Sequence, residues 1–227
     1  MTSQTQNSIP EIFNRKTIKH NHFKFNKLYK QIANELAERI KETNINFEYA
    51  LELNSKTLST GTQIENTKLV KNLYRTIIHS QTKNTLINFY SDEEFLPIKN
   101  NSLDLVYSVL GLNTVNDIPG TFRQIYNALK SNGLFIAYAD EKILGGLYQR
   151  IFPFCDIKTM GSLLQRAGFT MPMADQEKIV KSYKNISNLF TDIRSFNECN
   201  NLNSRAKTFT PKSIFKEAEI YLKDNYS

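Results

Sequence analysis

Two groups of polar residues directly follow apolar runs of the sequence and are the first candidates for ligand chemistry. Asp92 and Glu93 come after the run 85–90. Asn113 comes after the run 103–112. If these runs are parallel strands, their carboxyl ends meet at the edge of the sheet where ligands bind in open α/β folds. We therefore expect the two acids and the amide to face a ligand. An acidic turn exposed to solvent is the alternative for Asp92 and Glu93.

Other chemical signatures are missing. Nucleotide-binding α/β proteins place an acid at the end of the second strand, where it binds ribose hydroxyls. Residues 79–81 stand at that point and are His, Ser and Gln. The sequence has no Gly-x-Ser-x-Gly elbow, Walker loop or Cys/His nucleophile pair. Cys155 and Cys199 lie far apart, and with three histidines in all we expect no metal site. Catalytic residues stay unassigned.

The elements that would position these residues alternate between strand and helix patterns. The clearest unit is a buried strand at 103–112, a helix at 118–129 capped by Asp117, and a buried strand at 134–139 after Gly133 as helix stop. Such a βαβ unit implies a right-handed crossover and a parallel sheet covered on both faces. The sequence therefore predicts an α/β fold, a three-layer sandwich with a mostly parallel, Rossmann-like sheet.

Further elements follow from the same apolar spacing. The predicted strands are 48–53, 75–79, 85–90 and 178–183. The predicted helices are 25–41, 67–74, 160–167 ended by Gly168, 188–196 capped by Ser187, and a last helix opened by Pro211.

Composition places the chain among ordinary globular proteins. Of its 227 residues, 40% are hydrophobic and 22% are charged, and a domain of this size buries a sizeable core. Because no apolar run reaches about 18 residues and no signal-peptide pattern occurs, we expect a cytoplasmic protein without a membrane span. Residues 1–22 are expected to be a disordered or extended basic arm, and residues 23–227 a single domain.

The formal net charge of +7 raises the question of nucleic-acid binding, because basic patches bind phosphate. The densest basic stretch is 15–24. No RNA-binding or helix-turn-helix signature accompanies it, so a solvated basic arm is the preferred interpretation. We do not expect nucleic acid as a partner.

Three segments carry a resemblance to a known family. Residues 92–106 (DEEFLPIKNNSLDLV), 115–119 (VNDIP) and 129–136 (LKSNGLFI) resemble class I S-adenosylmethionine (SAM) methyltransferases. More narrowly, they resemble the methyltransferase-like assembly factors of respiratory complex I, and less closely the biotin-pathway malonyl-carrier-protein methyltransferases. The resemblance covers roughly residues 12–221.

The resemblance implies SAM as the cofactor and assigns roles to single residues. Asp92 matches the residue that receives the adenine amino group in these enzymes, with Glu93 beside it. Glu52 keeps an acid at the family position in the first strand. A helix at the place of 25–41 covers the cofactor pocket in the family.

Several positions depart from the family. Asn54, Lys56 and Leu58 stand where the family has glycines, which let the backbone approach the cofactor without a Cβ. Asn tolerates a positive φ, whereas Lys and Leu do so poorly. The connection that follows residue 139 is shorter than the family's insertion, and no apolar run remains for the family's final strand, so we expect an open sheet edge. The loop is either rebuilt for SAM or no longer a cofactor loop.

Three functions therefore stay open. The first is a SAM-dependent enzyme acting on a protein or carrier-protein substrate. For such an enzyme the resemblance implies either methylation or, as for the complex I factors, hydroxylation of an arginine on a complex I subunit. The second is a catalytically dead protein of the same fold that binds a protein partner in assembly. The third is a basic nucleic-acid-associated protein. A measured SAM affinity separates the first function from the second.

Overall fold

The computed structural model describes residues 11–17, 27–78, 87–139, 156–177, 179, 181–195, 200–205 and 207–226. The strands are β1 (Phe47–Glu52), β2 (Val70–Ile77), β3 (Ile87–Tyr90), β4 (Leu103–Val109) and β5 (Leu129–Tyr138). The helices are α1 (Lys27–Glu42), α2 (Leu58–Asn66), α3 (Ile118–Ala128), α4 (Ile157–Ala167), α5 (Ile186–Ser195) and α6 (Lys212–Tyr226). Two short 3-10 turns are η1 (Arg15–Thr17) and η2 (Leu112–Thr114).

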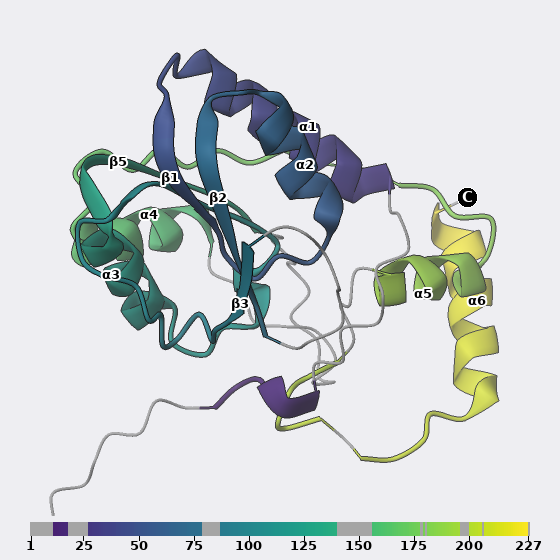
Figure 1. Ribbon diagram of the computed structural model, residues 1–227. Coiled ribbons are helices and arrows are strands. Elements are labelled where there is room, and N and C mark those ends of the chain that lie inside the picture. Colours follow the sequence, from purple (N-terminus) through teal and green to yellow (C-terminus); the bar gives the residue numbers. More distant parts are fainter. Residues whose placement is uncertain are drawn as a thin grey trace, which may run out of the picture.

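The centre of the fold is a five-stranded sheet in the order β3-β2-β1-β4-β5. All of its neighbouring strands pair in parallel. Helices α1 and α2 cover one face, and α3 and α4 cover the other (Figure 1). The predicted α/β three-layer sandwich is thereby confirmed.

Helix α1 covers its face because its apolar residues recur every three or four positions and form one stripe. Ile32, Leu36 and Ile40 on this stripe are buried in one cluster with Ala50 of β1 and Leu105 of β4. Burial of such side chains is the main favourable term in holding the helix on the sheet. The predicted helix 25–41 is confirmed, within two residues at its start.

Helix α3 covers the opposite face and has the predicted cap. Phe122 and Ile125 are buried in the second cluster. Asp117 Oδ1 accepts a hydrogen bond from the Gly120 backbone N–H at 2.9 Å, which satisfies one of the free donors at the helix start. This cap fixes where the chain leaves the carboxyl end of β4 and enters the helix.

Residues 67–74 form no helix, which corrects the sequence prediction. Most of them belong to β2, and the helix is the preceding segment α2. β2 lies between β1 and β3 and bonds to both, so its ladder contacts outweigh the local helical spacing. The sequence of α2 has Leu58 and Ile64 as its apolar residues, too few for a clear helical stripe.

Three smaller predictions are also wrong. Gly133 does not stop a helix, because β5 begins directly at Leu129 and Gly133 lies within it, at the irregular stretch of the β4–β5 register. Residues 179 and 181–183 have no strand structure. Ser187 does not cap α5, since the helix already begins at Ile186 and the Asn188 N–H bonds to Asn185 Oδ1 at 2.9 Å.

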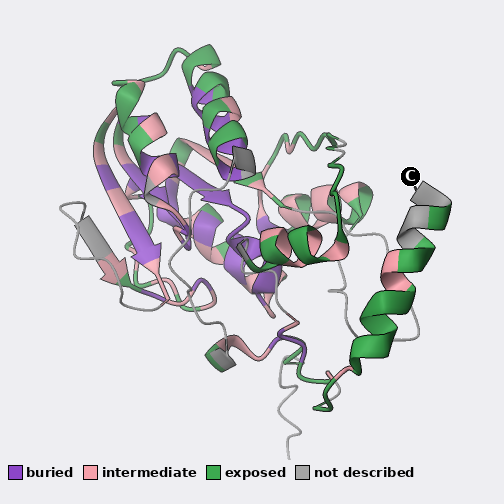
Figure 2. Ribbon diagram, turned by 90° about the vertical axis from the view of Figure 1, so that its right-hand side faces the viewer, coloured by how far each residue is buried: buried purple, intermediate pink, exposed green. Residues whose placement is uncertain are grey.

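The outer strand β5 pairs with β4 alone among the described residues. Within that part of the chain, the open edge expected from the sequence is present. Helices α5 and α6 lie beside the sheet, not on either covered face (Figure 1), and contact each other through Phe190 and Phe215, whose ring centroids are 5.4 Å apart. Much of α6 is exposed (Figure 2). None of the described helices is long and apolar enough to cross a membrane.

Candidate cofactor site

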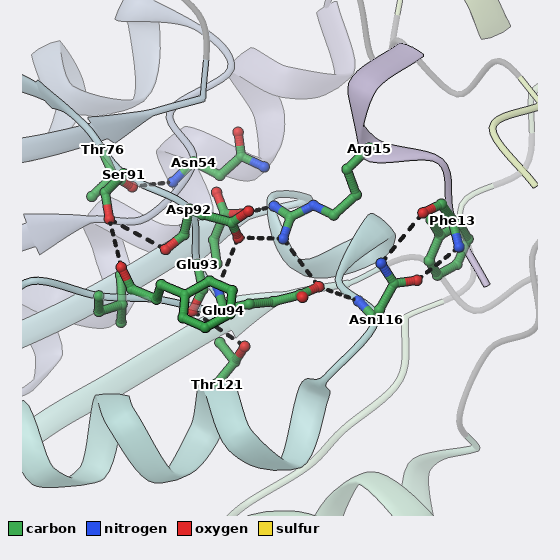
Figure 3. A network of polar contacts seen from close by, with 12 residues as sticks. Phe13, Arg15, Asn54, Thr76, Ser91, Asp92, Glu93, Glu94, Asn116 and Thr121 are labelled. Carbon is green, nitrogen blue, oxygen red and sulfur yellow. Dashed lines mark hydrogen bonds and ion pairs between the residues drawn. The ribbon is translucent and has the colours of Figure 1, made fainter. Parts of the chain in front are cut away.

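The carboxyl ends of the parallel strands bring predicted site residues to one edge of the sheet. Asn54 follows β1, Asp92 and Glu93 follow β3, and Asn113 lies in η2 after β4. Figure 3 shows the first three of these in one polar network, together with Arg15 from the N-terminal segment. This edge is where open α/β sheets bind ligands.

Asn54 makes the turn after β1 in the left-handed region, with a φ of 49°, which asparagine tolerates. Its backbone N–H donates to Thr76 Oγ1 at 2.8 Å, and its Nδ2 donates to the Gly111 carbonyl at 2.9 Å. A Cβ on Gly111 would lie 2.8 Å from the Leu53 carbonyl oxygen, so only glycine allows this approach. Asn54 Oδ1 is buried and accepts no hydrogen bond within the described residues.

Glu52, another predicted site residue, pairs with the buried cation Arg75 and not with the other predicted site residues. Its Oε2 lies 2.9 Å from Arg75 Nε and accepts from the Tyr107 hydroxyl at 3.3 Å. Burial raises the pKa of Glu52, and the positive charge of Arg75 opposes the shift. Gly61 of α2 leaves room for the guanidinium, because a Cβ there would lie 1.5 Å from Arg75 Nη2. The ion pair connects β1 with β2 beneath α2, and the Tyr107 hydroxyl adds β4. Each charge needs the other, because a buried charge without a partner is strongly destabilising.

Helix α3 positions the acidic loop that follows β3. Thr121 Oγ1 donates to the Glu93 carbonyl at 3.3 Å, and Gln124 Nε2 donates to the Glu94 carbonyl at 2.7 Å. Gln124 Oε1 accepts from the Leu96 N–H at 2.8 Å. The backbone of the loop is therefore fixed, and its carboxylates are held beside the strand ends.

The guanidinium of Arg15 contacts all three acids of this loop. It bonds to Asp92 Oδ1 and Glu93 Oε2 and lies 3.0 Å from Glu94 Oε1. The Arg15 side chain is 10% exposed and that of Glu93 is 0% exposed. Burial raises the pKa of Glu93 to about 7, and the Arg15 charge opposes this shift. Glu93 Oε1 accepts no hydrogen bond within the described residues.

Residues 11–17, which we call the N-terminal strap, reach the acids through a second set of contacts. The Phe13 N–H donates to Asn116 Oδ1 at 2.7 Å, and Asn116 Nδ2 donates to the Phe13 carbonyl at 3.3 Å. The Phe13 side chain is buried with Leu202. The Asn14 N–H donates to the Asn201 carbonyl at 2.7 Å. The strap therefore lies between the acidic loop and the C-terminal segment 200–205.

The positions of the remaining predicted residues say less about a ligand site. Asn113 is 5% exposed and Lys56 is 8% exposed. Leu58 is the first residue of α2. Residues 79–81, the connection after residue 139 from 140 to 155, and most of the basic stretch 15–24 lie outside the described residues. Within the described residues no group of three or more His, Cys, Asp or Glu could hold a metal ion.

Sequence reasoning missed Arg15 and Asn116. The available signal was the acidic triplet of Asp92, Glu93 and Glu94, which lies in a stretch without basic residues between Lys83 and Lys99. Acids that become buried need a cation or several donors. The triplet therefore called for a partner from elsewhere in the chain, but the pattern could not say which of the 29 basic residues supplies it.

A surface hollow of about 580 Å³ lies at the opposite, amino-terminal edge of the sheet. It is lined by Asn46, Phe47, Glu48, Lys68, Leu69 and Lys71. None of the predicted site residues borders it. The chemistry at the carboxyl ends of the strands, not this hollow, therefore marks the candidate site.

Comparisons with known proteins show which proteins this chain is similar to. Residues 48–137 match the family model described as a methyltransferase domain. The mitochondrial arginine hydroxylase NDUFAF5 of Homo sapiens is 28% identical over 225 residues, which cover 87% of this chain and 64% of that protein. A malonyl-[acyl-carrier protein] O-methyltransferase of Gallionella capsiferriformans is 28% identical over 135 residues, covering 55% of this chain and 47% of that enzyme. Residues 48–137 of this chain are therefore similar to a methyltransferase domain.

A solved structure shares the fold of this chain. The crystal structure of the [4+2]-cyclase SpnF matches with a TM-score of 0.51 and 14% identity, covering 71% of this chain and 63% of that chain. At this identity the match shows the fold alone. The resemblance predicted from residues 92–106, 115–119 and 129–136 is confirmed. This chain spans 64%, less than two thirds, of the length of NDUFAF5.

Proposed function

We propose that this chain is a SAM-dependent, methyltransferase-like protein that binds SAM at the carboxyl ends of β1, β3 and β4 and acts on a protein or carrier-protein substrate. The observation that carries the proposal is a pair of buried acceptor oxygens, Asn54 Oδ1 and Glu93 Oε1. Neither has a hydrogen-bond partner within the described residues. Buried polar atoms without partners are costly, and a ligand with N–H or O–H donors at this edge would satisfy them.

The residues at this edge fit the donors of SAM. The cofactor brings an adenine amino group, ribose hydroxyls and an ammonium group, all of which donate hydrogen bonds. Asp92, Glu93 and Asn54 supply acceptors that match them. The Asn54 side chain replaces the bare backbone of a glycine loop, and the loop still makes the left-handed turn, with a φ of 49°.

SAM, when bound, supplies a methyl group on a positively charged sulfur for transfer to a nucleophile. The residues of this chain would bind and orient it, because the reaction depends mainly on holding the methyl in line with the nucleophile. Asp92 and Glu93 would accept the adenine amino group, Asn54 would accept from the methionine end, and Asn113 would border the site.

The proposed substrate class is taken from the names of two relatives. One is named as an arginine hydroxylase and another as an O-methyltransferase of a malonyl carrier protein. We propose a protein substrate such as a complex I subunit, with methylation or arginine hydroxylation as the reaction. NDUFAF5 is mitochondrial by name, so the cytoplasmic location expected from the sequence stays a prediction.

Calorimetric titration of the purified chain with SAM tests the proposal. Asp92→Ala should weaken binding by about 1 to 3 kcal/mol, the typical effect of losing a hydrogen bond to a charged group. Asp104→Ala is the control, because this acid lies at the opposite end of β4 and pairs with Lys130 at 2.8 Å. Equal affinity of native protein and Asp92→Ala would contradict the proposed site.

The second candidate is a catalytically dead member of the fold that binds a protein partner in assembly. Two observations favour it: Arg15 already contacts Asp92 and Glu93, and the Asn54 amide bonds to the Gly111 carbonyl. We expect the native affinity to be weak enough to leave the purified protein mostly free of SAM.

Glycine substitution separates the two candidates. Replacement of Asn54, Lys56 and Leu58 by glycine should raise SAM affinity if the rest of the site is intact. Lys56→Gly alone is the cleaner variant, because Leu58 begins α2, where a glycine costs up to about 1 kcal/mol, and because Asn54 Oδ1 is itself a proposed acceptor for SAM. The absence of SAM binding in the native chain and in both variants would favour the second candidate.

A further inference from the structure

We propose that the N-terminal strap, residues 11–17, is an intramolecular competitor of SAM, with the Arg15 guanidinium bound at the carboxylates that would receive the adenine amino group. The inference rests on the proposed function, since it takes Asp92 and Glu93 as the cofactor acids. It concerns the chain's own control of access to that site.

The contacts of Arg15 use the atoms that a ligand would need. Asp92 Oδ1 bonds to Arg15 and also accepts the Glu94 N–H at 2.9 Å. Glu93 Oε2 bonds to Arg15 as well. A guanidinium and an adenine amino group are both planar N–H donors, and a guanidinium is the stronger partner for carboxylates because it is charged. An amino group that approaches the same oxygens must displace Arg15.

The strap is built to stay near the acids when Arg15 leaves them. Phe13 is 5% exposed and contacts Leu202, which is also 5% exposed. Asn116 bonds to both backbone polar groups of Phe13, and its own N–H donates to Glu94 Oε1 at 2.6 Å. These contacts hold Arg15 at a high local concentration, as a short tether does for any intramolecular ligand.

The two carboxylates still have capacity for a ligand. Glu93 Oε1 has no partner in the described part of the chain, and Asp92 is 43% exposed at its side chain. If the adenine amino group used only these oxygens, Arg15 and SAM would bind together. Competition therefore requires that the ligand and Arg15 bind the same two oxygens, Asp92 Oδ1 and Glu93 Oε2.

The first test measures the affinity of full-length variants for SAM and for S-adenosylhomocysteine by calorimetry. Arg15→Ala should bind both ligands about tenfold more tightly, the effect of removing one charged hydrogen-bonding competitor. Phe13→Ala should change both affinities in the same direction, because it loosens the strap and leaves the acids intact. Lys130→Ala is the matched control, since it removes a cation paired with Asp104 at the opposite edge of the sheet.

The pair of ligands distinguishes competition from charge repulsion. The two molecules share adenosine, but only SAM carries the sulfonium charge. Competition at the adenine acids predicts the same fold-change for both ligands. A fold-change confined to SAM would overturn the competition, because it would mean that Arg15 acts on the sulfonium through space.

Amide hydrogen exchange of residues 11–17 provides the second readout. Saturating S-adenosylhomocysteine should reduce the protection of residues 15–17 in the native chain, while the amides of Phe13 and Asn14, held by Asn116 and Asn201, should keep theirs. Unchanged or increased protection, with affinities of Arg15→Ala and Phe13→Ala equal to the native value, would overturn the competition and leave the proposed function standing. The absence of binding by the native chain and every variant would overturn the proposed function and the competition together.

Discussion

Glu93 should make the stability of this protein depend on pH in the opposite sense to an ordinary paired acid. Burial raises its pKa to about 7 from an ordinary value of 4.5, with Arg15 opposing the shift. A carboxyl group with a raised pKa in the folded state binds its proton more tightly there than in the unfolded chain. Its contribution to stability is complete below about pH 4.5 and is lost as the pH rises through about 7.

The size of this effect follows from the pKa difference. Each pKa unit between the folded and unfolded states corresponds to about 1.4 kcal/mol of unfolding free energy. The interval from 4.5 to about 7 therefore amounts to roughly 3 kcal/mol. Glu93→Gln keeps the shape of the side chain and an acceptor oxygen for Arg15, but it cannot ionise.

Urea unfolding at a series of pH values from 4 to about 8 measures the effect. The stability of Glu93→Gln relative to the native chain should rise by roughly 3 kcal/mol across this range. The difference between the two chains removes the titration of the other acids. Glu48→Gln is the control, because Glu48 is exposed and lies 3.9 Å from exposed Lys71. Its curve should run parallel to the native curve.

Arg15→Ala provides an internal check on the cause. Loss of the Arg15 charge removes the effect that lowers the pKa of Glu93, so the pH range of the Glu93 effect should extend above 7. The reasoning would be refuted if native protein and Glu93→Gln kept a constant stability difference from pH 4 to about 8. Glu93 would then be ionised throughout, with Arg15 outweighing the cost of burial.

Three further substitutions test the fold that supports the site. Arg75→Ala leaves the carboxylate of Glu52 buried without its cation and should cost about 3 to 5 kcal/mol in urea unfolding. Gly168→Ala should cost about 1 to 3 kcal/mol, because Gly168 has a φ of 117° and a Cβ would lie 2.8 Å from the Tyr126 ring; an unchanged midpoint would contradict this. Asp117→Ala removes the α3 cap and should cost about 1 kcal/mol, whereas Asp117→Ser should recover most of it.

Most strands and helices of this fold could be predicted from the sequence, because apolar runs and helix caps are local signals. They can be recognised without knowing which segments pair with each other. The run 103–112 is apolar except for Asp104 and Ser108, as is typical of a strand buried on both faces. The cap at Asp117 is a local signal as well. Residues 67–74 misled the prediction, because β2 gains its order from pairing with both neighbours and not from its own spacing.

The candidate site was predictable only in part, for a related reason. Asp92 and Glu93 could be predicted because they follow a strand and belong to the segment 92–106, which resembles a known family. Their partner Arg15 is 77 residues away from Asp92 in the chain, and no periodicity links the two positions. Arg75, the partner of Glu52, likewise sits in a strand that the sequence suggested only at its end. Ion pairs between distant segments become visible only when the topology is known.

Arg15 and the Asn54 side chain have a common physical meaning. Both are donors from the chain itself that bind at the proposed cofactor site: Arg15 at the acids after β3, and the Asn54 amide at the Gly111 carbonyl after β4. Neither satisfies the edge completely, since Asn54 Oδ1 and Glu93 Oε1 lack partners in the described residues. In a protein that binds no ligand here, hydrogen bonds from its own residues to these two oxygens would increase stability. The two oxygens therefore favour a site that still receives a ligand.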